Sequence, residues 1–290
     1  MQAKGERTRL KYTENLGIEY GWFSLSRELA LTYLSSIKQT VREAEITDYI
    51  MPIWLPYLAS ILAVIGGLII LVYAIMLNTS MHPLHHIYYA GLHQVEVQET
   101  NIAMGLVALM SIVALIGTII NLYVIYKWIA RRNGHFSRVQ RLYSGVISFL
   151  EALGVSDPEI ASMKNIAEEA RFRESEKSAG LWLILYIVLG FIAWAYIMHF
   201  LTRDFVEHEY REQLFFKNLA EIAKRRNLVL ELPRRTVPDR NTVLYLVLTI
   251  ITLGLFGLYW IYTVTRDPNE HFLEHRVFEQ RLVSVLESML

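Results

Sequence analysis

Four long apolar stretches interrupt an otherwise polar chain. They cover Ile53–Leu77, Ile102–Tyr126, Gly180–Thr202 and Thr242–Thr265, and none of them contains Asp, Glu, Lys or Arg. Each stretch holds 23 to 25 residues. A helix of about 20 residues, rising about 1.5 Å per residue, crosses a hydrocarbon core about 30 Å thick. The pattern therefore predicts an all-α integral membrane protein with four transmembrane helices and the lipid bilayer as its solvent.

The segments outside these stretches show the spacing of amphipathic helices. In the tail, Asp267 and Pro268 are suited to the N-cap and first position of a helix. The stripe that follows alternates spacings of four and three, through His271, His275, Phe278, Leu282, Val285 and Met289. Two interpretations stay open. The stripe packs against its own protein or the headgroups, or it pairs two copies or two subunits as a short coiled-coil seam.

An internal repeat relates two parts of the chain. Residues 121–153 align with 257–289 without a gap, with ten identities in 33 positions, and His135 faces His271. A His-x-x-x-Glu-Gln spacing also recurs, in His208–Gln213 and His275–Gln280. We therefore expect two duplicated helical hairpins, each followed by an amphipathic helix. The predicted regions are an N-terminal segment (1–52), the first repeat (53–153), a polar helix (154–179) and the second repeat (180–290).

The distribution of basic residues predicts a topology. The loop Asn78–Asn101 has no Lys or Arg, whereas the N-terminal segment has seven and the Lys127–Lys177 connection has nine. Because basic residues are retained in the cytoplasm, both termini are expected inside a multi-pass cell-membrane protein. The nine basic residues of Arg203–Arg240 fit four spans poorly. The alternative is that the third and fourth runs are re-entrant hairpins, with the third run broken at Gly190 and the fourth at Gly254 and Gly257.

The C-terminal segment carries a recognisable pattern. It consists of Arg240–Leu244, Leu248–Tyr262 with its Thr-x-Gly-x-x-Gly-x-Tyr-Trp signature, and Arg266–Phe272. These residues resemble a prokaryotic integral-membrane family catalogued only as a domain of unknown function. In the duplicated first half, Asn121 and Val124 stand where the signature has Gly257 and Trp260. The resemblance implies membrane helices and supplies no catalytic residues.

The histidines are the main candidates for chemistry. His82, His86 and His93 lie in the loop between the first two apolar stretches, and imidazoles spaced in this way are candidate ligands for Zn²⁺ or Cu²⁺. His135, His199 and His271 each precede a phenylalanine near the end of an apolar stretch. Haem ligation by such a pair requires histidines that face each other inside a bundle. Interfacial positions explain these three more simply, so no cofactor is predicted.

Small and polar residues predict how the membrane helices pack. One face of the first stretch carries Ala59, Ala63 and Gly67, and one face of the second carries Ser111, Ala114, Thr118 and Asn121. Small residues allow close backbone approach, and an Asn can hydrogen-bond across the contact. In the fourth stretch, Gly254 and Gly257 are the equivalent candidates.

Composition narrows the function without fixing it. The 290 residues include 28 basic and 28 acidic side chains and no cysteine. This balance argues against nucleic-acid binding, and the lack of cysteine excludes disulfides and thiolate sites. The sequence contains no nucleotide-binding or hydrolase motif, so we do not expect an enzyme. The favoured hypothesis is a scaffold or interaction module with a cytoplasmic partner or a second copy. A subunit of an oligomeric channel or transport complex is the alternative, and an external metal binder that uses the histidine loop is the third.

Overall fold

The computed structural model describes residues 26–80 and 92–290, and every regular element within them is a helix. This confirms the all-α fold class. Helical residues 26–42 lead into α2 (Ala44–Thr47). The remaining helices are α3 (Leu55–Ser80), α4 (Leu92–Ala152), α5 (Pro158–Arg173), α6 (Ala179–Leu189), α7 (Phe191–Arg225), α8 (Thr242–Ile251) and α9 (Leu255–Glu287).

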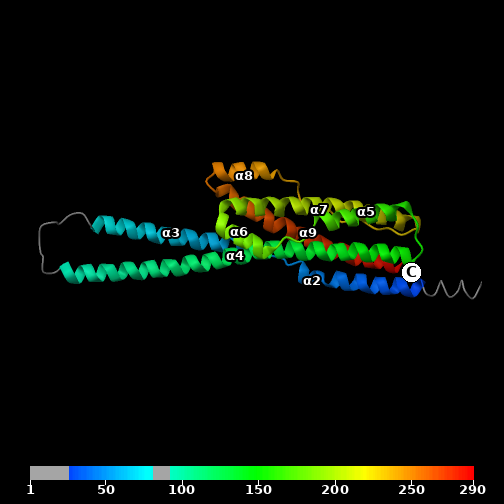
Figure 1. Ribbon diagram of the computed structural model, residues 1–290, viewed down its shortest axis with the longest axis horizontal. Coiled ribbons are helices and arrows are strands. Elements are labelled where there is room, and N and C mark those ends of the chain that lie inside the picture. Colours follow the sequence, from blue (N-terminus) through cyan, green and yellow to red (C-terminus); the bar gives the residue numbers. More distant parts are fainter. Residues whose placement is uncertain (1–25, 81–91) are drawn as a thin grey trace, which may run out of the picture.

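Two of these helices are long and apolar enough to cross a membrane. They are Leu55–Ile75 in α3 and Met104–Ala152 in α4, and few of their most apolar side chains are buried. Figure 1 shows α3 and the N-terminal half of α4 projecting side by side from one end of the molecule. The second half of α4 continues into a bundle with α5, α7 and α9.

The small-residue faces of α3 and α4 meet within this chain. Ala59 and Gly67 on α3 line a groove with Ala114, Thr118 and Asn121 on α4. Asn121 also donates a hydrogen bond from Nδ2 to the hydroxyl of Tyr186 on α6, at 3.0 Å. The side chain of Ala63 lies outside the described part of the structure.

The third and fourth apolar stretches are both broken. At Gly190 (φ 56°) the chain turns between α6 and α7, and at Gly254 (φ 95°) it turns between α8 and α9. Both φ values lie in the left-handed region that glycine adopts without strain. In each pair the second helix folds back against the first. Trp182 on α6 stacks on Tyr196 on α7, and Tyr245 on α8 contacts Trp260 on α9, with ring centroids 5.1 and 5.7 Å apart. Four continuous membrane-spanning helices are therefore not confirmed.

Gly257 has a separate packing role in the second turn. A Cβ at this position would lie 3.2 Å from Cγ2 of Thr249 and 3.4 Å from the ring of Trp194. The missing side chain thus lets α8 and α7 approach the start of α9.

The tail stripe is buried within its own chain. His275, Phe278 and Leu282 are at most 1 % exposed. Phe278 and Leu282 share a core with Val139, Leu142, Val146 and Phe149 of the equivalent stripe. The two stripes therefore pack in one intramolecular core, and these side chains offer no surface to a second subunit.

The tail helix begins earlier than its sequence predicts. Helix α9 runs through Pro268, although proline has no N–H for the carbonyl of Val264. Arg131 on α4 replaces the missing donor, since its Nη2 lies 2.8 Å from that carbonyl oxygen. Its Nη1 also donates to Oδ1 of Asn269 at 2.9 Å. The prediction that Asp267 starts a helix was wrong because a distant arginine compensates for the proline.

Candidate metal centre

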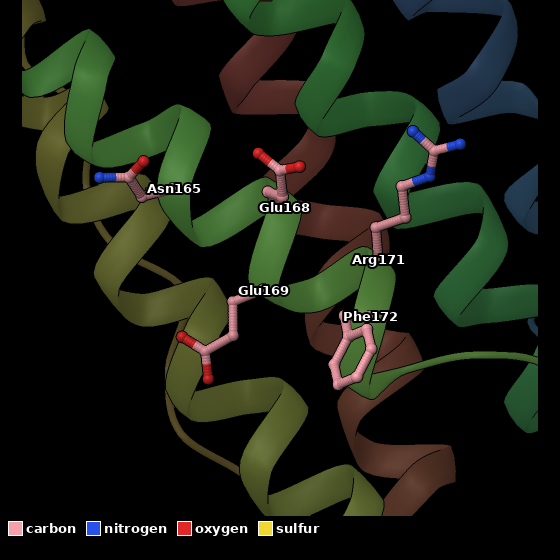
Figure 2. Close-up of a pocket in the computed structure, with 5 residues that line it drawn as sticks. All are labelled: Asn165, Glu168, Glu169, Arg171 and Phe172. Atoms are coloured by element: carbon pink, nitrogen blue, oxygen red, sulfur yellow. The ribbon is translucent and has the colours of Figure 1, made fainter.

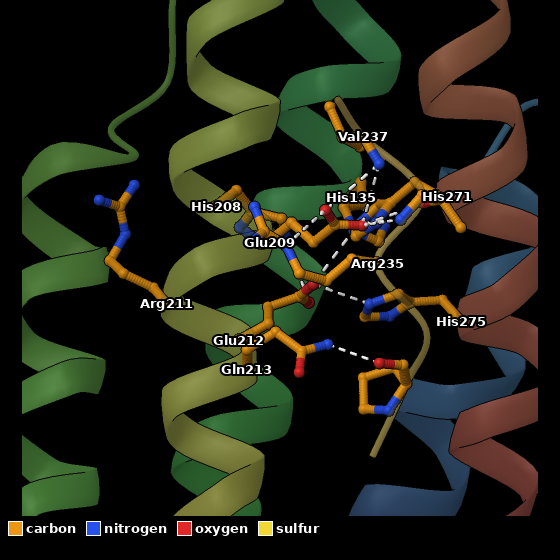
Figure 3. Close-up of polar contacts among 12 residues, drawn as sticks. His135, His208, Glu209, Arg211, Glu212, Gln213, Arg235, Val237, His271 and His275 are labelled. Atoms are coloured by element: carbon orange, nitrogen blue, oxygen red, sulfur yellow. Dashed lines mark hydrogen bonds and ion pairs between the residues drawn. The ribbon is translucent and has the colours of Figure 1, made fainter. Parts of the chain in front are cut away.

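Three long helices bring four potential metal ligands together in the bundle. They are His135 on α4, Glu212 on α7, and His271 and His275 on α9. One ligand atom from each lies within 4.8 Å of all the others. His271 and His275 are four residues apart, so both point from the same face of α9. All four side chains are at most 2 % exposed, and Figure 3 shows them converging from the three helices.

The distances inside this cluster suit a small tetrahedral ion. Nε2 of His135 lies 3.2 Å from Nε2 of His271. Oε2 of Glu212 lies 2.8 Å from Nε2 of His275 and 3.4 Å from Nε2 of His271. Ligands about 2.0–2.1 Å from a tetrahedral Zn²⁺ are about 3.3–3.4 Å apart, so the 3.2 and 3.4 Å separations match such a shell. The 2.8 Å separation is the length of a hydrogen bond and would lengthen by about half an ångström around an ion.

The outer nitrogen of each histidine faces a carboxylate. The Nδ1–carboxylate distances are 3.1 Å for His135–Asp48, 3.5 Å for His271–Glu209 and 3.4 Å for His275–Glu279. An ionised carboxylate only accepts hydrogen bonds, so each Nδ1 carries a hydrogen. When neutral, each ring therefore directs an Nε2 lone pair into the cluster. A histidine supported by a carboxylate in this way is typical of metal sites.

The cluster has an excess of negative charge. Five buried carboxylates surround it, namely Asp48, Glu174, Glu209, Glu212 and Glu279. Arg138 forms ion pairs with Asp48 and Glu279, and Arg211 forms one with Glu174. Uncompensated charge in a protein interior costs several kcal/mol per ion, so protons or a metal ion must supply positive charge.

The three ligand histidines differ in pKa. Burial alone would lower the pKa of His275, but the carboxylates of Glu212 and Glu279 raise it to about 10. Burial lowers the pKa of His135 well below its usual range, and burial together with nearby His275 lowers that of His271. In the metal-free protein at neutral pH, His275 is thus protonated and the other two ligand histidines are neutral.

A further histidine positions the glutamate ligand. Nε2 of His208 lies 3.1 Å from Oε1 of Glu212, and its Nδ1 lies 3.0 Å from Oε2 of Glu174. Burial opposes protonation, but the carboxylates of Glu174 and Glu212 raise the pKa of His208 to about 9. The charged imidazole therefore forms an ion pair with one oxygen of Glu212, while the other oxygen lies near His275 and His271.

The structure places the histidines differently from the sequence-based expectations. His135 and His271, expected at the interface, are buried and face each other, whereas His199 is exposed and contacts Thr242. His82 and His86 lie outside the described residues, and the side chain of His93 is also undescribed, so their metal site stays a prediction. The alignment of His135 with His271 signalled the site. The recurrent His-x-x-x-Glu spacing pointed to α7, but nothing in the sequence marks Glu212 as buried.

A second hollow lies on the outer face of α5. Figure 2 shows it lined by Asn165, Glu168, Glu169, Arg171 and Phe172. Phe172 is 85 % exposed, and Glu169 forms an ion pair with Arg173 one turn further along the helix. These side chains form a solvated helix face with no convergent ligand set.

Comparison with known proteins gives one partial match. A family described as "Domain of unknown function (DUF4234)" matches residues 240–290, which include α8, α9, His271 and His275. No curated protein and no solved structure matches the chain.

Proposed function

We propose that this chain is a non-enzymatic membrane scaffold whose cytoplasmic helical bundle is held together by one Zn²⁺ ion. The ligands are His135, Glu212, His271 and His275. The observation that carries this proposal is the convergence of three carboxylate-backed imidazoles and one carboxylate in a solvent-excluded position. Their inward atoms are lone-pair acceptors when neutral, which supports a cation at the centre of the cluster.

The donor set favours zinc over other common ions. Three imidazole nitrogens and one carboxylate oxygen match its borderline character and tetrahedral preference. Mg²⁺ and Ca²⁺ prefer oxygen ligands and higher coordination numbers. Four protein ligands fill a tetrahedral shell, and catalytic zinc sites usually keep one position open. The burial of all four ligands therefore supports a structural role, in which the ion clamps α4, α7 and α9 together.

The membrane placement follows from the apolar helices and the basic residues. We propose that α3 and the apolar part of α4 cross the bilayer, with both termini in the cytoplasm. The connection between them, Asn78–Asn101, has no Lys or Arg, which suits the external side. The metal-binding bundle would then lie directly against the inner membrane surface, where it can present its helices to a cytoplasmic partner.

We also propose that the sequence repeat reflects a structural duplication. Asn133 and Asn269 are aligned in the repeat. Asn133 hydrogen-bonds both the backbone N–H and the carbonyl of Lys177, and Asn269 makes the same pair of bonds to Met51. Lys177 precedes α6 and Met51 precedes α3, so each asparagine anchors the segment that leads into an apolar helix.

A zinc titration of the purified, metal-stripped protein tests the proposed function. We expect about one Zn²⁺ per chain and the release of about one proton, because metal binding requires deprotonated ligands. That proton comes from His275, whose pKa is raised to about 10. The apparent affinity should therefore rise about tenfold per pH unit between about pH 7 and 9.

A matched control distinguishes zinc binding in the bundle from zinc binding in the histidine loop. A variant with His82→Ala and His86→Ala should bind zinc with unchanged stoichiometry and affinity. Loss of stoichiometric zinc in this loop variant, or zinc binding without proton release, would contradict the proposal.

A further inference from the structure

We infer that two helical elbows dip into the cytoplasmic leaflet and return to the same side. The α6–α7 elbow comprises residues 179–202, and the α8–α9 elbow comprises residues 242–265. This inference rests on the proposed membrane location, but it goes beyond the metal centre. The apolar faces of the two elbows would contact the acyl chains of the bilayer.

The outer faces of both elbows are apolar and exposed. Neither elbow contains Asp, Glu, Lys or Arg. The exposed large side chains include Leu181, Ile184, Ile187, Val188, Leu189 and Ile192 in the first elbow, and Val243, Leu244, Ile250, Ile251, Leu253 and Leu255 in the second. Soluble proteins seldom expose contiguous apolar patches of this size. Burial of these side chains in lipid removes the free-energy cost of exposing them to water.

The helices that form the elbows are too short to cross. Helix α6 has 11 residues and α8 has 10, which gives each a length of about 15–17 Å, about half of the hydrocarbon core. The turns at Gly190 and Gly254 then reverse the chain. Irregular backbone at membrane depth must pack against protein or line a cavity. Both turns meet this condition, since they line a cavity of about 410 Å³ with Ser60, Asn121 and Trp194.

Hydrogen bonds fix both elbows to the two long apolar helices. The hydroxyl of Tyr57 on α3 donates to the carbonyl of Leu258 at 2.8 Å. Asn121 on α4 donates to the hydroxyl of Tyr186 at 3.0 Å. The elbows therefore lie beside the proposed spans, at a depth where those spans already face lipid.

The metal centre requires the elbows to return. If the third and fourth stretches each crossed the bilayer, residues 203–240 would lie outside, opposite to residues 127–177 and the tail. Yet Glu212 contacts His275 at 2.8 Å, and Arg211 contacts Glu174 at 2.8 Å. Such contacts cannot form across a membrane, so all three segments share one side.

Re-entry also resolves the charge imbalance of the four-span prediction. With two spans and two elbows, all 28 Lys and Arg residues lie on the cytoplasmic side. The nine basic residues of Arg203–Arg240 then conform to the positive-inside rule.

Single cysteines test this topology, because the chain has none of its own. We place one near the start of α4, in the proposed external segment (Gln98→Cys), one in the Arg203–Arg240 connection (Val229→Cys) and one at each tip (Leu189→Cys and Leu253→Cys). Val229 is 82 % exposed. In intact cells an impermeant maleimide should label only the Gln98→Cys variant, and permeabilisation should add the connection variant.

The two tip variants should resist the impermeant reagent on both sides. A fluorophore attached at either tip should be quenched by spin-labelled acyl chains in reconstituted vesicles. Labelling of the connection from outside would overturn the inference, as would labelling of the tips after permeabilisation. Ile187→Cys and Leu255→Cys replace any tip variant that does not reach the membrane fraction. Zinc content is measured on the same samples. Absence of zinc then contradicts the proposed metal site, whereas the labelling pattern alone tests the re-entrant topology.

Discussion

Replacement of His271 by alanine is expected to reduce bound zinc from about one ion per chain to less than about a tenth, because a tetrahedral site that loses one of four ligands binds weakly. His271 lies 3.2 Å from His135 and 3.4 Å from Glu212, so its loss removes one of the four ligands from the cluster. Elemental analysis of the detergent-purified protein measures the loss. His199→Ala is the matched control, since that histidine is exposed and touches Thr242 instead of the cluster.

The same variant should also lose zinc-dependent stabilisation. An ion present at a thousandfold excess over its dissociation constant stabilises the folded state by about 4 kcal/mol. The Tm of the original protein should therefore rise on addition of zinc and fall with a chelator. The Tm of His271→Ala should respond to neither. Full zinc content in this variant would show that the ion binds elsewhere.

Replacement of Arg138 by methionine should lower the free energy of unfolding by about 3–5 kcal/mol, because it leaves buried charges without a partner. Arg138 is fully buried and donates to both oxygens of Glu279, at 2.7 and 2.9 Å, and to Asp48 at 2.8 Å. These carboxylates support His275 and His135, so metal affinity should fall in the same variant.

A matched control for Arg138 lies one turn further along α4. Arg141 also forms an ion pair, with Glu43, but its side chain is 51 % exposed. Arg141→Met should therefore cost at most about 1 kcal/mol. Thermal unfolding in one detergent compares the two variants. Equal losses would show that burial does not set the strength of these ion pairs.

Much of the fold follows from the apolar pattern, but the topology does not. The charge-free stretches predict helices because their length and composition leave no other stable form in lipid. Whether a glycine bends such a stretch depends on contacts between the two helices that flank it. At Gly190 these contacts include the stacking of Trp182 on Tyr196. Similarly, Pro268 marks a helix start until Arg131 is seen to satisfy the carbonyl that it leaves free.

The metal centre is less predictable than the fold. Its four ligands come from three helices and span residues 135–275, so no local spacing contains them all. The repeat relates His135 to His271, but two aligned histidines also suit an interfacial position. The decisive facts are burial and direction, and both arise only when α4, α7 and α9 pack together. Glu212 belongs to the recurrent His-x-x-x-Glu-Gln spacing, but nothing in that spacing shows that its side chain is buried.

X-ray absorption at the zinc edge of the loaded protein tests the metal centre most directly. We expect four nitrogen or oxygen neighbours at about 2.0–2.1 Å, with the outer-shell scattering of about three imidazoles. That signature should disappear in the His271→Ala variant and persist in the His199→Ala control. A shell of about six oxygen atoms without imidazole scattering, or a signal unchanged by His271→Ala, would contradict the account.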